Sequence, residues 1–176
     1  MILTLTDSII LQMDNFPNLK KPSHLIATLF GIGKLPFGPG TWGSFATLGI
    51  WLISSPSIQN SFSLLFIILA TSIVICHFAT KGLVEKDQKS IVIDEFAGMW
   101  LALFISSKIS IFNIESVEAI NSAVITFILF RFFDILKPFP ISYIDKNFKN
   151  GFGIVLDDFI AGLVAGFLTI ALYSFL

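Results

Sequence analysis

The chain has 176 residues, of which 55% are hydrophobic and only 13% are charged, and its mean hydropathy is +0.85. Soluble domains carry about 25% charged residues, so this composition predicts an integral membrane protein of one domain. The net charge of −1 excludes a strongly basic surface for nucleic acid. Cys76 is the only cysteine, which excludes an intrachain disulfide.

The first part of the chain, residues 1–22, contains acidic residues and Pro17 and lacks the basic start and cleavage site of a signal peptide. We expect it to be a surface segment of the mature protein, followed by one helical domain over residues 23–176. Five apolar segments follow in chain order, at residues 43–54, 62–80, 91–106, 117–136 and 154–176.

A membrane span needs about 20 apolar residues, so the second, fourth and fifth segments are long enough to cross. The first and third are shorter, and they could be tilted, re-entrant or packed within the bundle. The predicted fold class is therefore all-α, a multi-helix integral membrane bundle of about five apolar helices.

The lysines between these segments predict the topology. If all five segments cross, nine lysines lie on one side and only Lys108 lies on the other, and the positive-inside rule assigns the nine to the cytoplasm. The nine are Lys20, Lys21, Lys34, Lys81, Lys86, Lys89, Lys137, Lys146 and Lys149. We expect the N-terminus inside and the C-terminus outside.

A Gly/Pro-rich loop at residues 31–44 precedes the first segment, with five glycines and two prolines in fourteen residues. This composition opposes a regular helix and lets the backbone approach a ligand closely. If Thr41 or Ser44 caps the following helix, free N–H groups would face the cytoplasmic interface and could bind phosphate. The candidate phosphate-binding residues here are Gly38, Gly40, Thr41 and Ser44, and a purely structural turn is the alternative.

Five of the twelve acidic residues lie inside or at the edge of apolar stretches. They are Asp94, Glu95, Asp134, Asp157 and Asp158. An ionised carboxylate is costly in or against a bilayer core, so it persists where a cation, a pore or chemistry needs it. With five crossings, all five acids lie at the cytoplasmic ends of their segments and can converge.

Such a cluster of oxygen ligands favours a hard cation, Mg²⁺ first. His24, His77 and Cys76 are too few and too scattered for a zinc site. The candidate metal ligands are the five acids together, and the candidate catalytic residues are Asp94, Glu95, Asp134 and Asp158.

Arg131 is the only arginine in a chain with ten lysines, and it lies three residues before Asp134 on the same helix face. A guanidinium can grip phosphate through two hydrogen bonds, or it can neutralise Asp134, and phosphate binding is the favoured interpretation. Lys137 lies one turn further along and joins Arg131 as a candidate phosphate-binding residue. Pro138 and Pro140 should end this helix.

The last segment carries Gly162 and Gly166, a GxxxG spacing that predicts close packing against another helix.

Carboxylates, a hard cation, one arginine and a glycine-rich loop at headgroup level suit phosphoryl transfer or hydrolysis on a lipid. The alternative is a small ion or solute transporter in which the same carboxylates form a cation path. That alternative predicts acids spread through the depth of the membrane.

Four motifs in order resemble those of the phosphatidylglycerophosphatase A family. They are the loop at 31–44, IVIDEFAGMW at 91–100, FRFFDILKPFPI at 130–141 and GFGIVLDDFIAG at 151–162. The resemblance extends from about Ser23 to the C-terminus. Ile93 stands where the family commonly has Trp, and the first twenty residues match nothing assignable.

The resemblance implies Mg²⁺-dependent hydrolysis of phosphatidylglycerophosphate to phosphatidylglycerol and phosphate at the bacterial inner membrane, with the active site facing the cytoplasm. The family's acidic motif residues map onto the five acids named above, and its basic ones map onto Arg131 and Lys137. Asp87 is a further acidic candidate. The lipid substrate is the one expected partner, and the sequence leaves the oligomeric state open.

Overall fold

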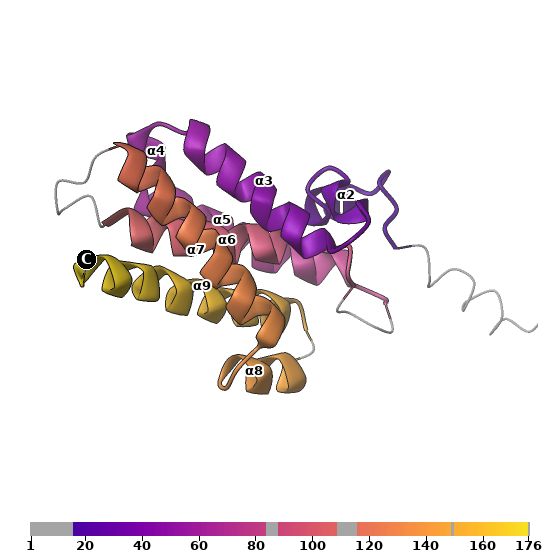
Figure 1. Ribbon diagram of the computed structural model, residues 1–176. Coiled ribbons are helices and arrows are strands. Elements are labelled where there is room, and N and C mark those ends of the chain that lie inside the picture. The colour runs from indigo at the N-terminus through magenta and orange to yellow at the C-terminus, as the bar shows by residue number, and fades with distance from the viewer. Residues whose placement is uncertain (1–15, 84–87, 109–115, 149, 176) are drawn as a thin grey trace, which may run out of the picture.

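The computed structural model describes residues 16–83, 88–108, 116–148 and 150–175, and all regular structure within these ranges is helical (Figure 1). The long helices are α3 (Pro39–Ile53), α5 (Phe62–Ala79), α6 (Ile93–Ser106), α7 (Ser116–Leu136) and α9 (Gly151–Ser174). The short ones are α2 (Pro22–Ala27), the 3-10 helix η1 (Ile32–Lys34), α4 (Pro56–Gln59) and α8 (Ile141–Asn147). The predicted all-α bundle of apolar helices is confirmed.

Three helical stretches are long and apolar enough to cross a membrane, namely Phe62–Ala79, Glu118–Leu136 and Gly151–Ser174. They correspond to the three segments that the sequence predicts as full spans. The other two long helices are shorter, with 15 residues in α3 and 14 in α6. At about 1.5 Å per residue, α6 is roughly 21 Å long, less than the hydrocarbon thickness of a bilayer.

Side chains and backbone geometry fix where the helices begin and end. The Ser61 side chain accepts a hydrogen bond from the Leu64 N–H at 3.2 Å at the start of α5. Asn150 does the same for the Gly153 N–H at 2.8 Å at the start of α9. α7 ends at Leu136 because the next residue, Lys137, has a φ of +43°. This break turns the chain towards α8.

Helix α3 begins earlier than the sequence predicts. The Gly/Pro-rich loop contains η1 and the first turns of α3, since Gly38, with a φ of +85°, forms the cap and Pro39 takes the first helical position. Proline fits there because an N–H at that position would have no partner inside the helix. Thr41 and Ser44 therefore lie within α3, so the condition that one of them caps the helix is not met.

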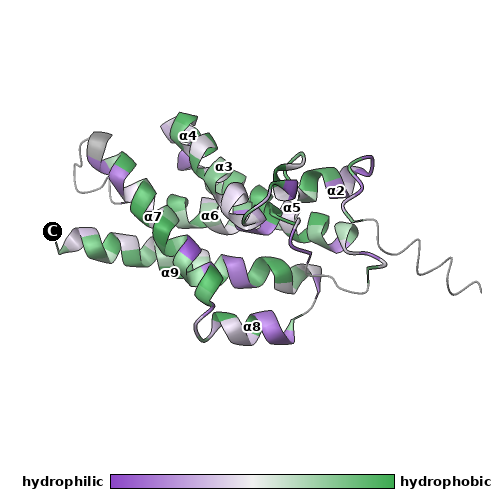
Figure 2. Cartoon of the chain, turned by 45° about the vertical axis from the view of Figure 1, so that its right-hand side comes forward, coloured by the Kyte–Doolittle hydropathy of each residue, from purple (hydrophilic) through white to green (hydrophobic). Residues whose placement is uncertain are grey.

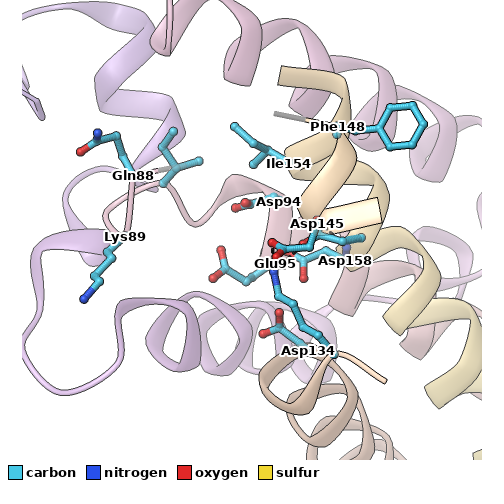
Figure 3. Close-up of a pocket in the computed structure, with 13 residues that line it drawn as sticks. Gln88, Lys89, Asp94, Glu95, Asp134, Asp145, Phe148, Ile154 and Asp158 are labelled. Atoms are coloured by element: carbon cyan, nitrogen blue, oxygen red, sulfur yellow. Dashed lines mark hydrogen bonds and ion pairs between the residues drawn. The ribbon is translucent and has the colours of Figure 1, made fainter. Parts of the chain in front are cut away.

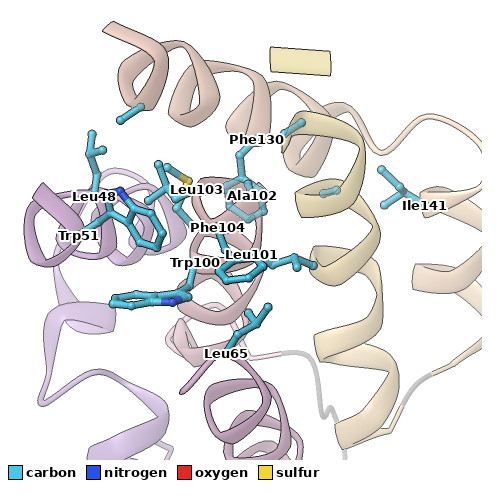
Figure 4. Close-up of a cluster of buried hydrophobic side chains, with 14 residues drawn as sticks. Leu48, Trp51, Leu65, Trp100, Leu101, Ala102, Leu103, Phe104, Phe130 and Ile141 are labelled. Atoms are coloured by element: carbon cyan, nitrogen blue, oxygen red, sulfur yellow. The ribbon is translucent and has the colours of Figure 1, made fainter. Parts of the chain in front are cut away.

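Helix α6 lies in the middle of the bundle and is buried on almost every side (Figures 1 and 4). Its Trp100 ring meets the Trp51 ring of α3 edge-on at 5.1 Å between centroids and stacks on Phe96 at 5.7 Å. Leu101, Leu103 and other α6 side chains fill the core around it. Of the options that the sequence left open for this segment, the structure shows packing within the bundle.

Glycines bring α6 and α9 into close contact. A Cβ at Gly98 would lie 2.5 Å from the Asp158 carbonyl oxygen, and one at Gly162 would collide with the Gly98 carbonyl. A Cβ at Gly166 would lie 2.9 Å from the Ala102 carbonyl oxygen. The close packing predicted from the GxxxG spacing is therefore confirmed, and it sets the distance between the acids of the two helices.

Candidate active site

A small cavity of about 90 Å³ opens where α6 and α9 begin and α7 ends (Figure 3). All five acids that the sequence singles out line it: Asp94, Glu95, Asp134, Asp157 and Asp158. Hydrophilic stretches interrupt α7 and α9 where these helices approach α8, while most of their length is apolar (Figure 2). The other lining residues are Gln88, Lys89, Ile91, Lys137, Asp145, Phe148, Gly153 and Ile154.

The direction of the helices explains why acids far apart in sequence meet. α6 starts at this end of the bundle with Asp94 and Glu95 in its first turn, and α7 ends here with Asp134 in its last turn. α9 starts here again and carries Asp157 and Asp158 about two turns inside the helix. Successive long helices run in opposite directions. The start of α6, the end of α7 and the start of α9 therefore lie on the same side of the bundle.

Asp94, Glu95 and Asp158 form the centre of the cluster. Each offers a carboxylate oxygen, and these oxygens all lie within 4.8 Å of one another. Asp94 and Asp158 are only 8% and 4% exposed. At an effective dielectric constant of about 20, each pair of ionised groups at that distance repels by about 3 kcal/mol. A cation among the three would offset this repulsion.

Two oxygens of this group lack hydrogen-bond donors in the part of the chain that the structure describes. They are Oδ1 of Asp94 and Oε2 of Glu95, and both are buried. A buried carboxylate oxygen without a partner is costly, and a bound cation would satisfy it. The donor set contains oxygen alone, which suits a hard ion such as Mg²⁺. The residues present therefore fit a magnesium site.

Asp157 lines the same cavity but is not part of this three-oxygen group, and it pairs with Lys137. The Lys137 Nζ lies 2.6 Å from Oδ2 of Asp157 and 2.7 Å from Oδ1 of Asp145 in α8. Burial works against the charge of Lys137, but Asp157 and Asp145 outweigh this effect and raise its pKa above the ordinary value. Lys137 therefore stays protonated and bridges α8 to α9.

Arg131 joins α7 to α3. Its Nη1 lies 2.5 Å from Oδ2 of Asp134 and donates to the Ser44 hydroxyl at 3.2 Å. The Ser44 hydroxyl in turn donates to the Gly40 carbonyl at 2.9 Å. A Cβ at Gly40 would collide with the Glu95 carboxylate, so the glycine lets the start of α3 approach this acid without displacing its side chain. Nε of Arg131 is buried without an acceptor among the described residues.

The predicted phosphate-binding residues thus divide into two groups. Arg131 and Lys137 reach the cluster directly, and Gly40 and Ser44 touch it through Glu95 and Arg131. Gly38 caps α3 and Thr41 is exposed on it, and neither lines the cavity. Asp87, Lys86 and Lys149 lie outside the described residues.

Three polar residues at the cavity were not predicted as site residues. Asp145 lies in the polar stretch of α8, where a carboxylate is not unusual by hydropathy. Lys89 and Gln88 come from the loop before α6. Lys89 is exposed and has no ion pair in the described part of the chain. Only the position of Lys89, five residues before Asp94, hints at its place.

The transporter alternative is not favoured by this arrangement. A cation path needs acids distributed through the membrane depth, whereas the five acids gather at one end of the bundle. Farther along α7 and α9, the buried polar contact is a pair of hydroxyls, with Thr126 donating to Thr169 at 3.1 Å.

Comparison with known proteins agrees with this site. A family model described as Phosphatidylglycerophosphatase A matches residues 25–173. The phosphatidylglycerophosphatase A of Haemophilus influenzae is 39% identical over 150 residues, which cover 84% of this chain and 86% of the relative. That of Escherichia coli is 35% identical over 148 residues, which cover 84% and 81%.

A third relative, from Bacteroides thetaiotaomicron, carries the provisional name phosphatidylinositol-3-phosphatase. It is 32% identical over 163 residues, which cover 87% of this chain and 96% of the relative. No solved structure matches. Since the family model spans most of the chain and two relatives of the same name cover more than four fifths of it, this membrane enzyme belongs to the phosphatidylglycerophosphatase A family.

Proposed function

We propose that the chain hydrolyses the phosphate monoester of phosphatidylglycerophosphate to phosphatidylglycerol and phosphate, with Mg²⁺ as cofactor. The bacterial relatives and the predicted topology support a place in the inner membrane with the cavity on the cytoplasmic side. The observation that carries the proposal is the buried oxygen cluster of Asp94, Glu95 and Asp158 in a chain of this family.

Mg²⁺ would be held by Asp94, Glu95 and Asp158, whose oxygens converge and include two without hydrogen-bond donors. Asp134 lines the same cavity and could contribute from the Arg131 side. Asp157 is engaged by Lys137 and would orient the site through it. The chemistry supplied by a bound Mg²⁺ is polarisation of the phosphoryl oxygens and activation of a water.

The chain's own residues would bind the phosphate and manage protons. Arg131 has no acceptor for its Nε among the described residues and pairs with the cavity-lining Asp134, and from there it would donate to a phosphoryl oxygen. Lys89 brings a cation that has no ion pair in the described part of the chain. The attacking water forms the new P–O bond and gives its proton to a carboxylate of the cluster. The P–O bond to glycerol breaks, and the glycerol oxygen takes up a proton.

The size of the cavity indicates which part of the substrate it can hold. At about 90 Å³ it is far smaller than the roughly 300–1,000 Å³ of a typical ligand pocket. It has room for a phosphoryl group and a cation, and the rest of the lipid must lie outside it. The same acids could therefore serve lipids with other headgroups, which gives weight to the name of the third relative.

The test is phosphate release by the purified protein in mild detergent, with Mg²⁺ or with EDTA, from phosphatidylglycerophosphate and separately from phosphatidylinositol 3-phosphate. Asp94→Asn keeps the size of the side chain and removes its charge. Its matched control is Glu118→Gln, an exposed acid near the start of α7 at the other end of the bundle.

We expect release from phosphatidylglycerophosphate that requires Mg²⁺, is lost in Asp94→Asn and persists in Glu118→Gln. Faster release from the inositol lipid would assign a different substrate to the same site. Activity that survives both EDTA and Asp94→Asn would contradict the proposed metal cluster.

A further inference from the structure

The turn between α2 and α3, residues 29–37, holds large apolar side chains out of the protein. We call it the aromatic loop. Phe30 is 76% exposed and Phe37 is 97% exposed, and Leu35 between them is exposed too. The loop lies beyond the three candidate spans, next to α2 and the first residue of α3 (Figure 1). Ordinary lipid-facing surface of a span therefore does not account for it.

The aromatic loop is built to keep this shape. The Phe30 N–H donates to the Leu25 carbonyl at 2.8 Å, and the Gly33 N–H donates to the Thr28 carbonyl at 3.0 Å. The Trp42 indole donates to the Pro36 carbonyl at 3.0 Å.

Three residues of the loop that are not glycine adopt left-handed backbone conformations. Leu29, Phe30 and Phe37 have φ values of +46°, +57° and +60°. Side chains with a Cβ rarely adopt this conformation, because it is strained. The hydrogen-bonded frame thus holds both rings outward at a conformational cost.

Exposed lysines surround the loop. Lys34 lies within the loop, and Lys20 and Lys21 precede α2. Lys89 lies in the segment before α6 that contacts the loop. None of the four has an ion pair in the described part of the chain. Aromatic rings with a basic border match a negatively charged leaflet at the level of its headgroups.

The loop is also tied to the catalytic end of the bundle. A Cβ at Gly33 would collide with the Ser90 carbonyl, so the loop rests against the segment that leads into Asp94 and Glu95. The far end of the loop runs into α3, where Gly40 abuts the Glu95 carboxylate. The depth of the loop in a membrane would therefore fix the depth of the cavity.

We propose that the aromatic loop inserts into the anionic leaflet on the cavity side, with Phe30 and Phe37 below the headgroups and the four lysines among them. The cavity mouth is then held at the depth of the lipid phosphates, so that a lipid monoester reaches it without leaving the bilayer. The insertion stands independently of the reaction, and its kinetic consequence rests on the proposed function.

Depth can be measured on the full-length protein in vesicles that contain phosphatidylglycerol. The native cysteine, the buried Cys76, is first replaced by alanine so that it cannot react with the label. A nitroxide is then attached to Phe37→Cys in this Cys76→Ala background. Its accessibility to oxygen, which partitions into lipid, is compared with its accessibility to a water-soluble nickel chelate. Lys34→Cys is the matched control in the same loop, and Ile67→Cys, on the exposed face of α5, is the reference for the hydrocarbon.

We expect the label at 37 to favour oxygen, in the direction of the label at 67, and the label at 34 to favour the nickel chelate. Replacing phosphatidylglycerol with a zwitterionic lipid should shift the label at 37 towards water. Equal nickel accessibility at 34 and 37 would overturn the proposal and leave the loop as a surface for a soluble partner.

A kinetic measurement separates this proposal from the proposed function. Phe30→Ser with Phe37→Ser should raise KM for the substrate in vesicles several-fold and leave kcat on a short-chain, water-dispersed analogue unchanged. Since both rings are exposed, the substitutions remove no core packing. A deep label at 37 in a protein without phosphatase activity would reject the function and keep the insertion. Full phosphatase activity with a water-exposed label at 37 would keep the proposed function and reject the insertion.

Discussion

Substitution of Gly98 by alanine tests whether the contact between α6 and α9 sets the geometry of the acid cluster. The added Cβ would lie 2.5 Å from the Asp158 carbonyl oxygen and 2.9 Å from the Phe130 ring. Ordinary contacts of this kind begin at 3.4 Å. The backbone of α9 must therefore retreat from α6 by about 0.9 Å, and Asp158 moves with it.

Two effects of different size follow from that displacement. Overpacking of this kind costs about 1–3 kcal/mol of stability. A misplacement of about 1 Å between groups that act together can cost on the order of 10²-fold in rate. We therefore expect Gly98→Ala to fold, with kcat reduced by about 10²-fold and a higher Mg²⁺ concentration at half-maximal activity.

The assay is phosphate release in detergent across a Mg²⁺ titration, with thermal unfolding followed by tryptophan fluorescence on the same samples. Gly49→Ala is the matched control, because a Cβ on this exposed residue of α3 meets nothing within 4 Å. That change should keep full activity and stabilise the helix by up to about 1 kcal/mol. Wild-type kcat and Mg²⁺ dependence in Gly98→Ala would refute the reasoning.

Three further outcomes follow from the cavity. Lys89→Ala should raise KM for the lipid with little change in kcat, whereas Lys108→Ala, at the other end of α6, should leave both constants unchanged in the same micellar assay. Asp145→Asn should lower the free energy of unfolding by less than about 1 kcal/mol, because the partly exposed ion pair of Asp145 with Lys137 is screened by solvent. A larger loss in thermal unfolding would mean that the position of α8 depends on this ion pair.

The third outcome concerns pH. Since the pKa of Lys137 is raised in the folded protein, its contribution to stability is full below its unfolded pKa and is lost only as pH rises through the folded value. The difference in unfolding temperature between the wild type and Lys137→Gln should thus stay constant from about pH 7.5 to 9.5. A difference that shrinks over this range would show that the lysine deprotonates there.

The acids of the site could be predicted because they break a strong pattern. A carboxylate such as Asp94 or Asp158 in an apolar stretch is conspicuous, and the alternation of crossings assigns both to one end. That they share one cavity also depends on the close glycine packing of α6 against α9, which the structure shows. Asp145 lies among other polar residues, so its carboxylate does not stand out from the local hydropathy and could not be singled out in this way. Its role depends on the turn at Lys137, which only the folded backbone reveals.

The partners of the basic residues could not be derived from spacing either. A separation of three residues places Arg131 beside Asp134 but does not decide between ion pairing and phosphate binding. The structure shows the ion pair, with Ser44 of a distant helix as a second acceptor. The start of α3 was mispredicted because glycine and proline, taken by composition, suggest a loop. In fact Pro39 suits a first helical position, and Gly40 lies directly against the Glu95 carboxylate.

The burial of α6 has a consequence for how the protein is made. With 14 residues and two acids in its first turn, α6 is too short and too polar at one end to partition into lipid as an independent segment. Its flanking helices α5 and α7 meet the criteria for insertion by themselves. Biogenesis must therefore deliver α6 together with a neighbour, as part of a helical hairpin. The pair Asp94 and Glu95 would then enter with that neighbour, and the acid cluster would be complete only once α9 packs against α6 and brings Asp158 to it.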